Sequence, residues 1–438
     1  MNSSVFVVVG LSFGDEGKGS LTDYLVRKHG MHTVVRFNGG SQAGHNVVLA
    51  DGRQHTFAQF GSGAFAGCRT HLSRYMLVNP QFLMNEERHL QELGFEHNYA
   101  RLTVERTALV TTPFQVAANR LREMLRAEGT GRHGSCGMGI GETMADWVTS
   151  PADSLRIEDL EVPTRMRCKL TISQIRKRSE LEGTCGVSTL TPAMEQQWAI
   201  LTDPHIVDVC VENYEKFAHL ATFVDDTYLA TLLSREGGVI FEGAQGVLLD
   251  QDWGFFPHVT RTSTTIENAR VLIDHFADGR VKKLGLMRAY ATRHGPGPFP
   301  TEDASLQLPD SHNCFGEWQR SFRVGHLDVV AARYALQVIG GVDEIVMTCV
   351  DRVEQLGRWK LCVGYQPSGP DDITRLSPPR ADDLVARAAW TAKISTVTPI
   401  YEAYRDLDEF IRRVEELLET PVRLCSYGPT AEDKRPRC

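Results

Sequence analysis

Residues 5–19 read VFVVVGLSFGDEGKG and join a short apolar run to a glycine-rich turn that carries one lysine. A buried strand that ends in such a turn is typical of a phosphate-binding loop. Backbone N–H groups can surround phosphate oxygens there, and the start of the following helix favours anions. Asp15 and Glu16 lie inside the turn. Two carboxylates would repel a triphosphate unless they hold a metal ion or move a proton, so the loop predicts chemistry as well as binding.

The turn departs from an ordinary Walker A loop. That motif needs a glycine five residues before the second glycine and a Ser or Thr after the lysine. Here Ser12 stands five residues before Gly17, and Gly19 follows Lys18, so no hydroxyl occupies the usual magnesium position. A glycine-rich strand-to-helix turn without a ligand explains this stretch alone as well.

The bulk composition limits the classes of function. The chain has 438 residues and a net charge of −8, which does not suggest a nucleic-acid surface. Its apolar runs fall short of the roughly 18 residues of a membrane span, and charged residues interrupt the N-terminal run. The ten cysteines form no CxxC pair, which argues against zinc and disulfides and fits a reducing compartment. We therefore expect a cytoplasmic protein without membrane or nucleic-acid partners.

Several apolar, β-branched runs predict buried strands, each close to a glycine-rich turn and separated by helical patterns. This alternation indicates an α/β fold with a large, mostly parallel central sheet flanked by helices. A helix is predicted from Leu407 to Leu418, where apolar residues recur at helical spacing before Pro421. The predicted strands are residues 5–9, 33–37, 238–241, 345–348 and 422–426.

Further segments place polar or glycine-rich residues directly after an apolar run. In residues 39–45, His45 is a candidate proton donor because histidine titrates near neutrality. In residues 241–250, the Gln245 amide can recognise donors and acceptors on a polar ring. Residues 134–141 contain enough glycine for close approach to a ligand, although a flexible surface loop explains them equally well. The Pro/Gly-rich stretch 288–300 predicts a stiff, shaped loop.

Together these segments resemble the adenylosuccinate synthetase family, in family order and over nearly the whole chain. The resemblance implies one domain over residues 1–438, with a sheet like that of P-loop NTPases, inserted helical and loop subdomains, and a helical insertion at about residues 80–235. It also implies a homodimer. The matching stretches are GDEGKG at 14–19, VVRFNGGSQAGH at 34–45, FEGAQGVLLD at 241–250, AYATRHGPGPFPTE at 289–302, RVGHLD at 323–328 and SYGP at 426–429.

The resemblance also implies a reaction. In this family GTP phosphorylates the 6-oxygen of IMP, with Mg²⁺ as cofactor, and the amine of aspartate then displaces the phosphate. Asp15 matches the family's general base and a magnesium ligand, and the carbonyl of Gly44 matches a second ligand. His45 matches the general acid and Lys18 a second support for the transferring phosphoryl group. Gln245 matches the amide that holds position 6 of the purine.

The remaining binding residues implied by the resemblance fall into three groups. Those for GTP include Asp351, whose carboxylate would accept from guanine N1 and N2, groups that adenine lacks as donors. The GTP group is Gly14, Gly17, Lys18, Gly19, Gly44, His45, Asp351, Ser426, Gly428 and Pro429. The group for the purine nucleotide is Asp15, Gln42, Ser135, Cys136, Gln245 and Thr260. The group for the amino acid is Arg320 and Arg323.

This chain departs from the family pattern mainly where anions are recognised, which makes it a divergent member. Only Arg320 and Arg323 remain of four consecutive arginines in the amino-acid loop. Cys349 replaces a lysine near the guanine aspartate, and Ser150 stands where an arginine reaches the neighbouring subunit's nucleotide phosphate, with Arg156 as a possible substitute. Each lost charge-assisted contact costs about 1.5–3 kcal/mol, so aspartate binding is expected to be weakened or rearranged.

Three functions remain open from the sequence. The first is a divergent adenylosuccinate synthetase with rearranged aspartate contacts. The second is a specialised paralogue that uses the same activation and amine displacement on another purine, such as dGMP, or with another amine. The third is a non-catalytic nucleotide-binding regulatory paralogue. The retained acid–base residues Asp15 and His45 argue against the third, since a pure binder does not need them.

Overall fold

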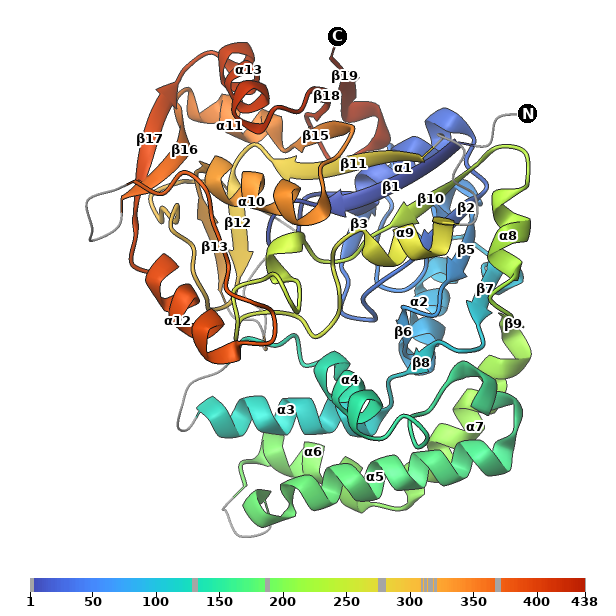
Figure 1. The fold of residues 1–438 in the computed structure, drawn as a ribbon. Helices are drawn as coiled ribbons and strands as arrows, with labels where there is room; N and C mark the ends of the chain where they lie inside the picture. The colour runs from blue at the N-terminus through green and yellow to red at the C-terminus, as the bar shows by residue number, and fades with distance from the viewer. Residues whose placement is uncertain are drawn as a thin grey trace.

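A computed structural model describes residues 4–127, 133–185, 190–274, 281–308, 310, 313, 318, 321–366 and 372–437. Its centre is a ten-stranded sheet in which neighbouring strands run parallel, except for the antiparallel pair at one edge (Figure 1). From that edge, the strands are β19 (Lys434–Pro436), β18 (Val422–Ser426), β15 (Glu344–Thr348), β11 (Val281–Arg288), β1 (Ser4–Gly10), β10 (Gly238–Glu242), β2 (Thr33–Arg36), β5 (Arg69–Leu72), β7 (Leu102–Glu105) and β9 (Thr222–Val224).

The predicted α/β class and its mostly parallel sheet are confirmed. All five predicted strands are present as β1, β2, β10, β15 and β18, with ends that differ by at most one residue. The predicted C-terminal helix is α13 (Leu407–Leu418), which starts after the N-cap Asp406 and buries Phe410, Ile411 and Val414.

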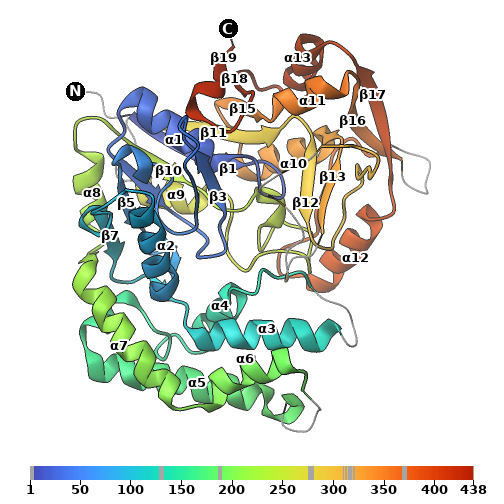
Figure 2. The ribbon, with the colours of Figure 1, turned by 180° about the vertical axis from the view of Figure 1, so that it is seen from behind.

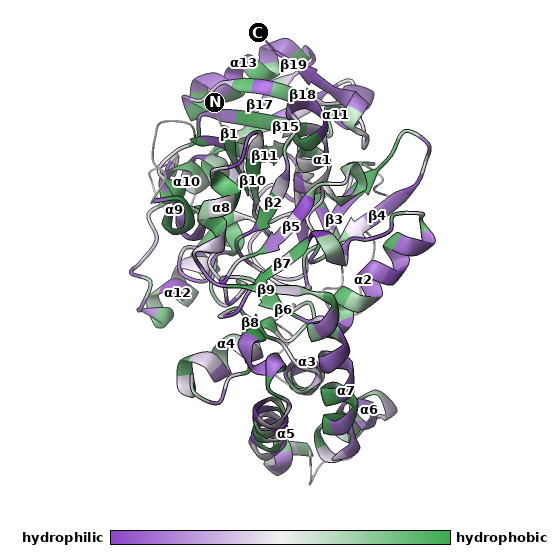
Figure 3. Cartoon of the chain, turned by 90° about the vertical axis from the view of Figure 1, so that its right-hand side faces the viewer, coloured by the Kyte–Doolittle hydropathy of each residue, from purple (hydrophilic) through white to green (hydrophobic). Residues whose placement is uncertain are grey.

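The middle strands are apolar on both faces because helices cover both sides of the sheet. Val5 and Val7 of β1 pack in one cluster with α8 (Tyr228–Leu233) and α9 (Glu267–Ile273). Phe6 and Val8 pack on the other face against α1 (Lys18–His29), as alternation along a strand requires. Figures 1 and 2 show α9 and α1 on opposite faces, and Figure 3 shows the middle strands mainly in the hydrophobic colour.

A layer of helices lies beside the sheet at the lower end of the molecule in Figure 1. Its apolar side chains form one buried cluster that includes Phe114, Leu170 and Tyr214. Residues 80–235 supply these helices, and they also supply β7 and β9 at the edge of the main sheet. The helices of this segment are α2 (Pro80–Glu92), α3 (Pro113–Ala127), α4 (Ile140–Thr149), α5 (Pro163–Cys185), α6 (Pro192–Thr202), α7 (His205–Leu220) and α8.

Smaller sheets and the remaining helices surround the other end of the main sheet. Helices α10 (Val329–Ile339), α11 (Val350–Leu356), α12 (Leu384–Ile394) and α13 complete the described helices. The small sheets are β3 (His45–Val48) with β4 (Gln54–Phe57), β6 (Leu77–Val78) with β8 (Leu109–Val110), β12 (Ala291–His294) with β13 (Phe322–Gly325), and β14 (Leu327–Asp328) with β16 (Trp359–Gln366) and β17 (Thr398–Tyr404). Among the described segments, no helix combines the length and hydropathy that crossing a bilayer requires.

The direction of the strands fixes where a site can form. β1 pairs in parallel with β10 and β11, β10 with β2, and β11 with β15. Their carboxyl ends therefore lie at one edge of the sheet, where parallel α/β folds place their ligands. The loops that follow β1, β2, β10, β11 and β15 all leave from this edge.

Candidate functional site

A pocket of about 950 Å³ opens at this edge and brings most of the predicted site residues together. Segments from α3 to α5 close its far side. The predicted site residues that line it are Gly14, Asp15, Gly17, Lys18, Gly19, Gln42, Gly44, His45, Ser135, Cys136, Gln245, Thr260, Asp351, Ser426, Gly428 and Pro429.

The two predicted amino-acid contacts are not placed in this pocket. Arg320 lies outside the described residues. Arg323, on β13, donates to the Glu302 carboxylate (Nε–Oε1, 3.0 Å) and to the carbonyl oxygens of Gly295 (3.1 Å) and Gly297 (3.0 Å). With its donors engaged in this way, Arg323 does not line the pocket.

The first loop has an unusual backbone that turns Asp15 toward the pocket. Gly14 and Gly17 have φ values of 95° and 88°, and Asp15 itself has a φ of 61°. A non-glycine residue in the left-handed region costs energy and persists only where its surroundings hold it. Arg288 provides part of that support, because its Nε donates to the Asp15 carbonyl oxygen (2.5 Å).

Glu16 holds this loop together from inside. Its carboxylate is fully buried and accepts hydrogen bonds from the backbone N–H groups of Ser12 (3.1 Å) and Gly14 (3.0 Å). Its other oxygen accepts from the Lys18 ammonium (2.5 Å). Burial alone would raise the pKa of Glu16, but Lys18 and the hydrogen bonds outweigh it and lower the pKa. The sequence did not assign Glu16 a role. In the structure its carboxylate links Ser12, Gly14 and Lys18 and so stabilises the conformation of the phosphate loop.

His45 is held by a second buried carboxylate. Its Nδ1 lies 2.8 Å from Oε1 of Glu242, at the end of β10, and Glu242 also accepts from the Ser62 backbone N–H (3.1 Å). Burial lowers the pKa of His45 to about 4, although Glu242 opposes this. Burial would raise the pKa of Glu242, but His45 and Arg36 outweigh it and lower the pKa to about 2. At neutral pH a neutral imidazole therefore donates from Nδ1 to an ionised carboxylate.

The other ring nitrogen of His45 is available to a ligand. Nε2 has no hydrogen-bond partner among the described residues, and His45 lines the pocket. A polyphosphate bound beside it would raise the pKa of the imidazole, because a nearby anion favours the charged form. An anion bound there would therefore favour the charged imidazole, and the contact with Glu242 fixes the orientation of the ring.

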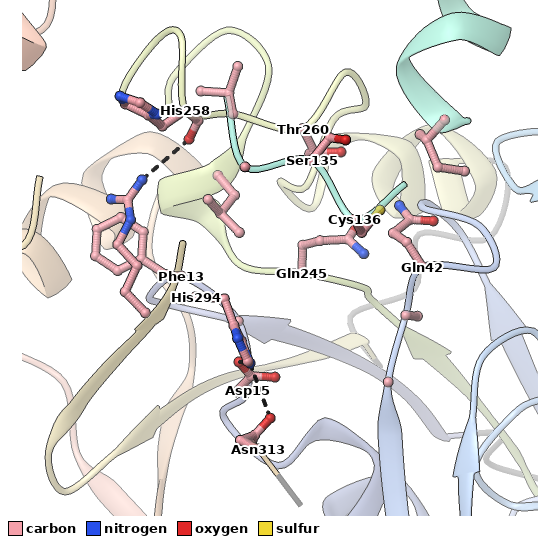
Figure 4. Close-up of a pocket in the computed structure, with 18 of the residues that line it drawn as sticks. Phe13, Asp15, Gln42, Ser135, Cys136, Gln245, His258, Thr260, His294 and Asn313 are labelled. Atoms are coloured by element: carbon pink, nitrogen blue, oxygen red, sulfur yellow. Dashed lines mark hydrogen bonds and ion pairs between the residues drawn. The ribbon is translucent and has the colours of Figure 1, made fainter. Parts of the chain in front are cut away.

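His294 is a neighbour of Asp15 that sequence reasoning did not single out. Its Nε2 lies 3.4 Å from Oδ2 of Asp15 and 3.3 Å from Oδ1 of Asn313 (Figure 4). Both neighbours are oxygen acceptors, so the ring proton belongs on Nε2. The stiff loop 288–300 was recognised in the sequence, but the contact depends on how that loop folds back over residue 15.

Two side-chain amides converge where a polar ring could bind. Oε1 of Gln245 and both amide atoms of Gln42 are buried without a hydrogen-bond partner among the described residues. A Cβ atom added at Gly39 would lie 3.2 Å from Gln245 Oε1 and 3.6 Å from Gln42 Nε2, so both amides border the same small space. Buried amides are normally satisfied. These two are therefore positioned for the donors and acceptors of a ligand (Figure 4).

Another part of the pocket combines one carboxylate with backbone groups. Asp351 stands in the first turn of α11, and burial raises its pKa. Ser426, at the end of β18, donates to the Gly428 carbonyl oxygen (2.9 Å) and so shapes the adjacent turn. Cys349, where a lysine was expected, has a φ of 56° and lines the pocket beside them.

Comparisons with known proteins agree with this arrangement. Residues 7–435 match the family model described as adenylosuccinate synthetase. The chain is 31% identical to adenylosuccinate synthetase from Mycobacterium tuberculosis over 442 residues, covering 97% of this chain and 96% of that one. It is also 31% identical to adenylosuccinate synthetase from Methylibium petroleiphilum over 444 residues, covering 97% and 95%.

Two solved structures share the fold. Fully ligated adenylosuccinate synthetase from Plasmodium falciparum has a TM-score of 0.81 at 20% identity and covers 100% of both chains. Succinoaminodeoxyadenylate synthetase from cyanophage S-2L, bound to dGMP and dATP, has a TM-score of 0.62 at 16% identity, with 100% and 96% coverage.

Replacing Glu16 by Gln tests whether its carboxylate stabilises the phosphate loop. Gln keeps the shape but leaves the buried Lys18 ammonium without its carboxylate, so we expect a loss of about 3–5 kcal/mol in the free energy of unfolding in urea. Glu212→Gln is the control, because it breaks an exposed Glu–Lys pair and should leave that free energy unchanged. Equal stability of Glu16→Gln and the wild type would contradict the assignment.

The low pKa of His45 predicts a specific pH dependence of stability. The unfolded state takes up a proton near pH 6.5 and the folded state only near pH 4. Stability due to His45 is therefore lost as pH falls from 6.5 toward 4, at up to about 1.4 kcal/mol per pH unit. Urea titrations between pH 7 and 5 should show a shallower slope for His45→Gln than for the wild type. The exposed-histidine control His205→Gln should keep the wild-type slope. An unchanged slope in His45→Gln would show that folding does not lower the pKa of His45.

Proposed function

The chain belongs to the adenylosuccinate synthetase family, and we propose that it phosphorylates the 6-oxygen of an IMP-like nucleotide and then joins the amine of L-aspartate to carbon 6. It is a carbon–nitrogen ligase that uses GTP as a substrate and Mg²⁺ as a cofactor. The observation that carries the proposal is the meeting, in one pocket, of the phosphate loop, the Glu242-held His45 and the unpaired amides of Gln42 and Gln245.

The first step needs a base and a source of positive charge. The Asp15 carboxylate takes the proton from purine N1, and the electron pair that it releases makes oxygen 6 nucleophilic. That oxygen attacks the γ-phosphorus of GTP, the bond to the bridging oxygen breaks, and GDP leaves. Lys18 and a protonated His45 balance the charge on the transferring phosphoryl group. Asp15 suits the base because its side chain is partly exposed in the pocket, whereas Glu16 is fully buried.

The second step exchanges phosphate for the amine. The nitrogen lone pair forms the bond to carbon 6, the carbon–oxygen bond breaks toward the phosphate, and the nitrogen gives its surplus proton to the departing phosphate. The unpaired Gln245 and Gln42 amides hold the ring during this exchange. Amine displacement is possible because phosphate is a far better leaving group than the hydroxide that the unphosphorylated oxygen would form.

The residues of the pocket fit Mg²⁺. Within the described part of the chain, no cluster of three or more His, Cys, Asp or Glu residues could hold a metal alone. Mg²⁺ ordinarily takes only one or two protein carboxylates and fills its shell with substrate phosphates and water. The Asp15 carboxylate and the Gly44 carbonyl oxygen, which both belong to pocket residues, would hold it. Bound there, the ion supplies charge neutralisation at the phosphates.

One observation supports a second candidate. Arg323 does not line the pocket, and its guanidinium is already paired with Glu302 and two carbonyl oxygens. A paralogue with the same activation step, but another amine or another purine such as dGMP, agrees with that placement. We also propose that the chain forms a homodimer, as is typical of the family.

A product assay separates these candidates. The protein is incubated with Mg²⁺, GTP and either IMP or dGMP, with and without aspartate, and GDP and the succinyl-purine are quantified. Aspartate-dependent succinyl-AMP, formed together with GDP, is expected. GDP formation without a succinyl-purine would identify another amine or acceptor, and tight GTP binding without turnover on any purine would indicate a regulatory protein.

Asp15→Asn and His45→Gln should each lower turnover by at least about 100-fold, because they remove the base and the acid of the first step. GTP binding, measured calorimetrically, should remain within a few-fold of the wild type. The control Asp51→Asn changes an exposed aspartate that does not line the pocket and should retain full turnover. Near-normal turnover in either test variant would remove that residue from the acid–base pair.

Asp351→Asn tests nucleotide choice. Asn keeps the size of the side chain but presents an amide donor where guanine also donates, so we expect GTP affinity to fall by about 100-fold. ATP affinity should change little, so the ratio of GTP affinity to ATP affinity should fall. Glu354→Gln, on the same helix but outside the pocket, is the matched control. If the variant bound GTP and ATP more weakly by the same factor, Asp351 would not be the residue that hydrogen-bonds to guanine.

A further inference from the structure

Most cationic side chains of the pocket are already neutralised by the protein itself. On its helical side, Arg122 contacts the carboxylates of Glu142 (2.9 Å) and Glu180 (2.6 Å). Lys177 contacts Glu142 (3.0 Å) and Asp146 (2.8 Å). Arg126, on the same helix as Arg122, contacts Glu123 at 2.8 Å. These cations stabilise the wall of the pocket and have little charge left for a ligand.

The cations on the sheet side are also engaged. The Lys18 ammonium is paired with Glu16 and belongs to the phosphoryl-transfer part of the proposed site, and Arg288 contacts the Asp310 carboxylate at 2.9 Å. Arg352 lies 3.9 Å from Asp310 as well. Arg293 is buried, donates to the Pro298 carbonyl oxygen (2.8 Å) and stacks its guanidinium on the Phe13 ring.

Arg261 differs from all of these. It lines the pocket and is exposed, and no hydrogen bond or ion pair involves its guanidinium among the described residues. The side chain runs over the first turn of α4, where a Cβ atom added at Gly141 would lie 3.2 Å from Arg261 Cγ. Glycine at position 141 therefore leaves room for Arg261 to lie along the wall of the pocket.

The neighbours of Arg261 are hydroxyl groups suited to phosphate. Thr260, the preceding residue, and Ser135 both line the pocket, and Figure 4 draws their side chains in the same region. Ser135 Oγ accepts from the Asn119 amide (2.9 Å) and from the Gly137 backbone N–H (3.3 Å), which leaves its own proton to donate. A phosphate monoester carries about two negative charges at pH 7. Hydroxyl groups alone do not neutralise that charge, and a guanidinium does so with matching geometry.

We propose that Arg261 is the counter-charge for the 5′-phosphate of the purine nucleotide, acting with Thr260 and Ser135 of the same chain. This inference rests on the proposed function, which places a nucleoside monophosphate in the pocket. It assigns the phosphate contact to the subunit that carries the rest of the site. Arg156, the substitute considered from the sequence, instead stacks on Trp147 (4.8 Å) and lies 3.6 Å from Glu158, outside the pocket lining.

The test compares nucleotide and nucleoside binding in matched variants. Dissociation constants for IMP, dGMP, inosine and GTP are measured calorimetrically for the wild type, Arg261→Gln, Arg261→Lys and the control Arg156→Gln. Arg261→Gln should weaken monophosphate binding by roughly 10- to 100-fold and leave inosine and GTP within about twofold. Arg261→Lys should be intermediate, because an ammonium keeps the charge but not the fork of donors. Arg156→Gln should match the wild type.

Each other outcome has a distinct meaning. If the wild type binds a monophosphate and Arg261→Gln binds it equally well, the inference is wrong and the proposed function stands. A loss of GTP or inosine affinity in Arg261→Gln, or of monophosphate affinity in Arg156→Gln, would also overturn it. If the wild type binds neither IMP nor dGMP, the proposed function itself fails. Equal thermal unfolding of all variants shows that none of these results reflects misfolding.

Discussion

The site depends on the interactions of the buried Glu16 carboxylate with Lys18 and the loop backbone. A charge removed from water is tolerated only when it is paired and hydrogen-bonded, and Glu16 receives both from Lys18 and two backbone N–H groups. Meeting that requirement fixes the turn after β1, with positive φ at Gly14, Asp15 and Gly17. The neighbouring carboxylate of Asp15 is then left facing the pocket. One acidic residue of the pair therefore builds the loop, and the other is free for chemistry.

The same division of roles recurs at His45. Glu242 is buried behind the imidazole and orients it, while the opposite ring nitrogen remains unpaired. Both carboxylates satisfy the protein's own groups before any ligand arrives, so binding needs little rearrangement of the catalytic side chains. Such preorganisation is a large part of how phosphoryl-transfer sites lower their barrier. The nucleotide parts of the pocket are less complete, because groups on Gln42, Gln245 and Arg261 have no partner within the described part of the chain.

The sequence predicted the fold class, five central strands and α13, because apolar periodicity and glycine-rich turns are local signals. Most of the predicted site residues line the pocket, because the motifs that carry them follow strand ends. The side-chain pairs inside the site could not be predicted from local sequence patterns, since His45 and Glu242, for example, are 197 residues apart in the chain. His294 contacts Asp15 only because the loop 288–300 folds back over residue 15. Arg261 stands out only once the ion pairs of the other arginines and lysines in the pocket are known. Arg323 matched a motif, yet Glu302 holds it outside the pocket.

The central claim is that oxygen 6 of the purine is phosphorylated before the amine arrives. The most direct measurement uses a purine nucleotide labelled with oxygen-18 at position 6 and follows the label by mass spectrometry during turnover with GTP and aspartate. The label is expected to pass to inorganic phosphate, one atom for each succinyl-purine formed, because the carbon–oxygen bond breaks after phosphorylation. Succinyl-purine formed with unlabelled phosphate, and with the label released into water, would contradict it.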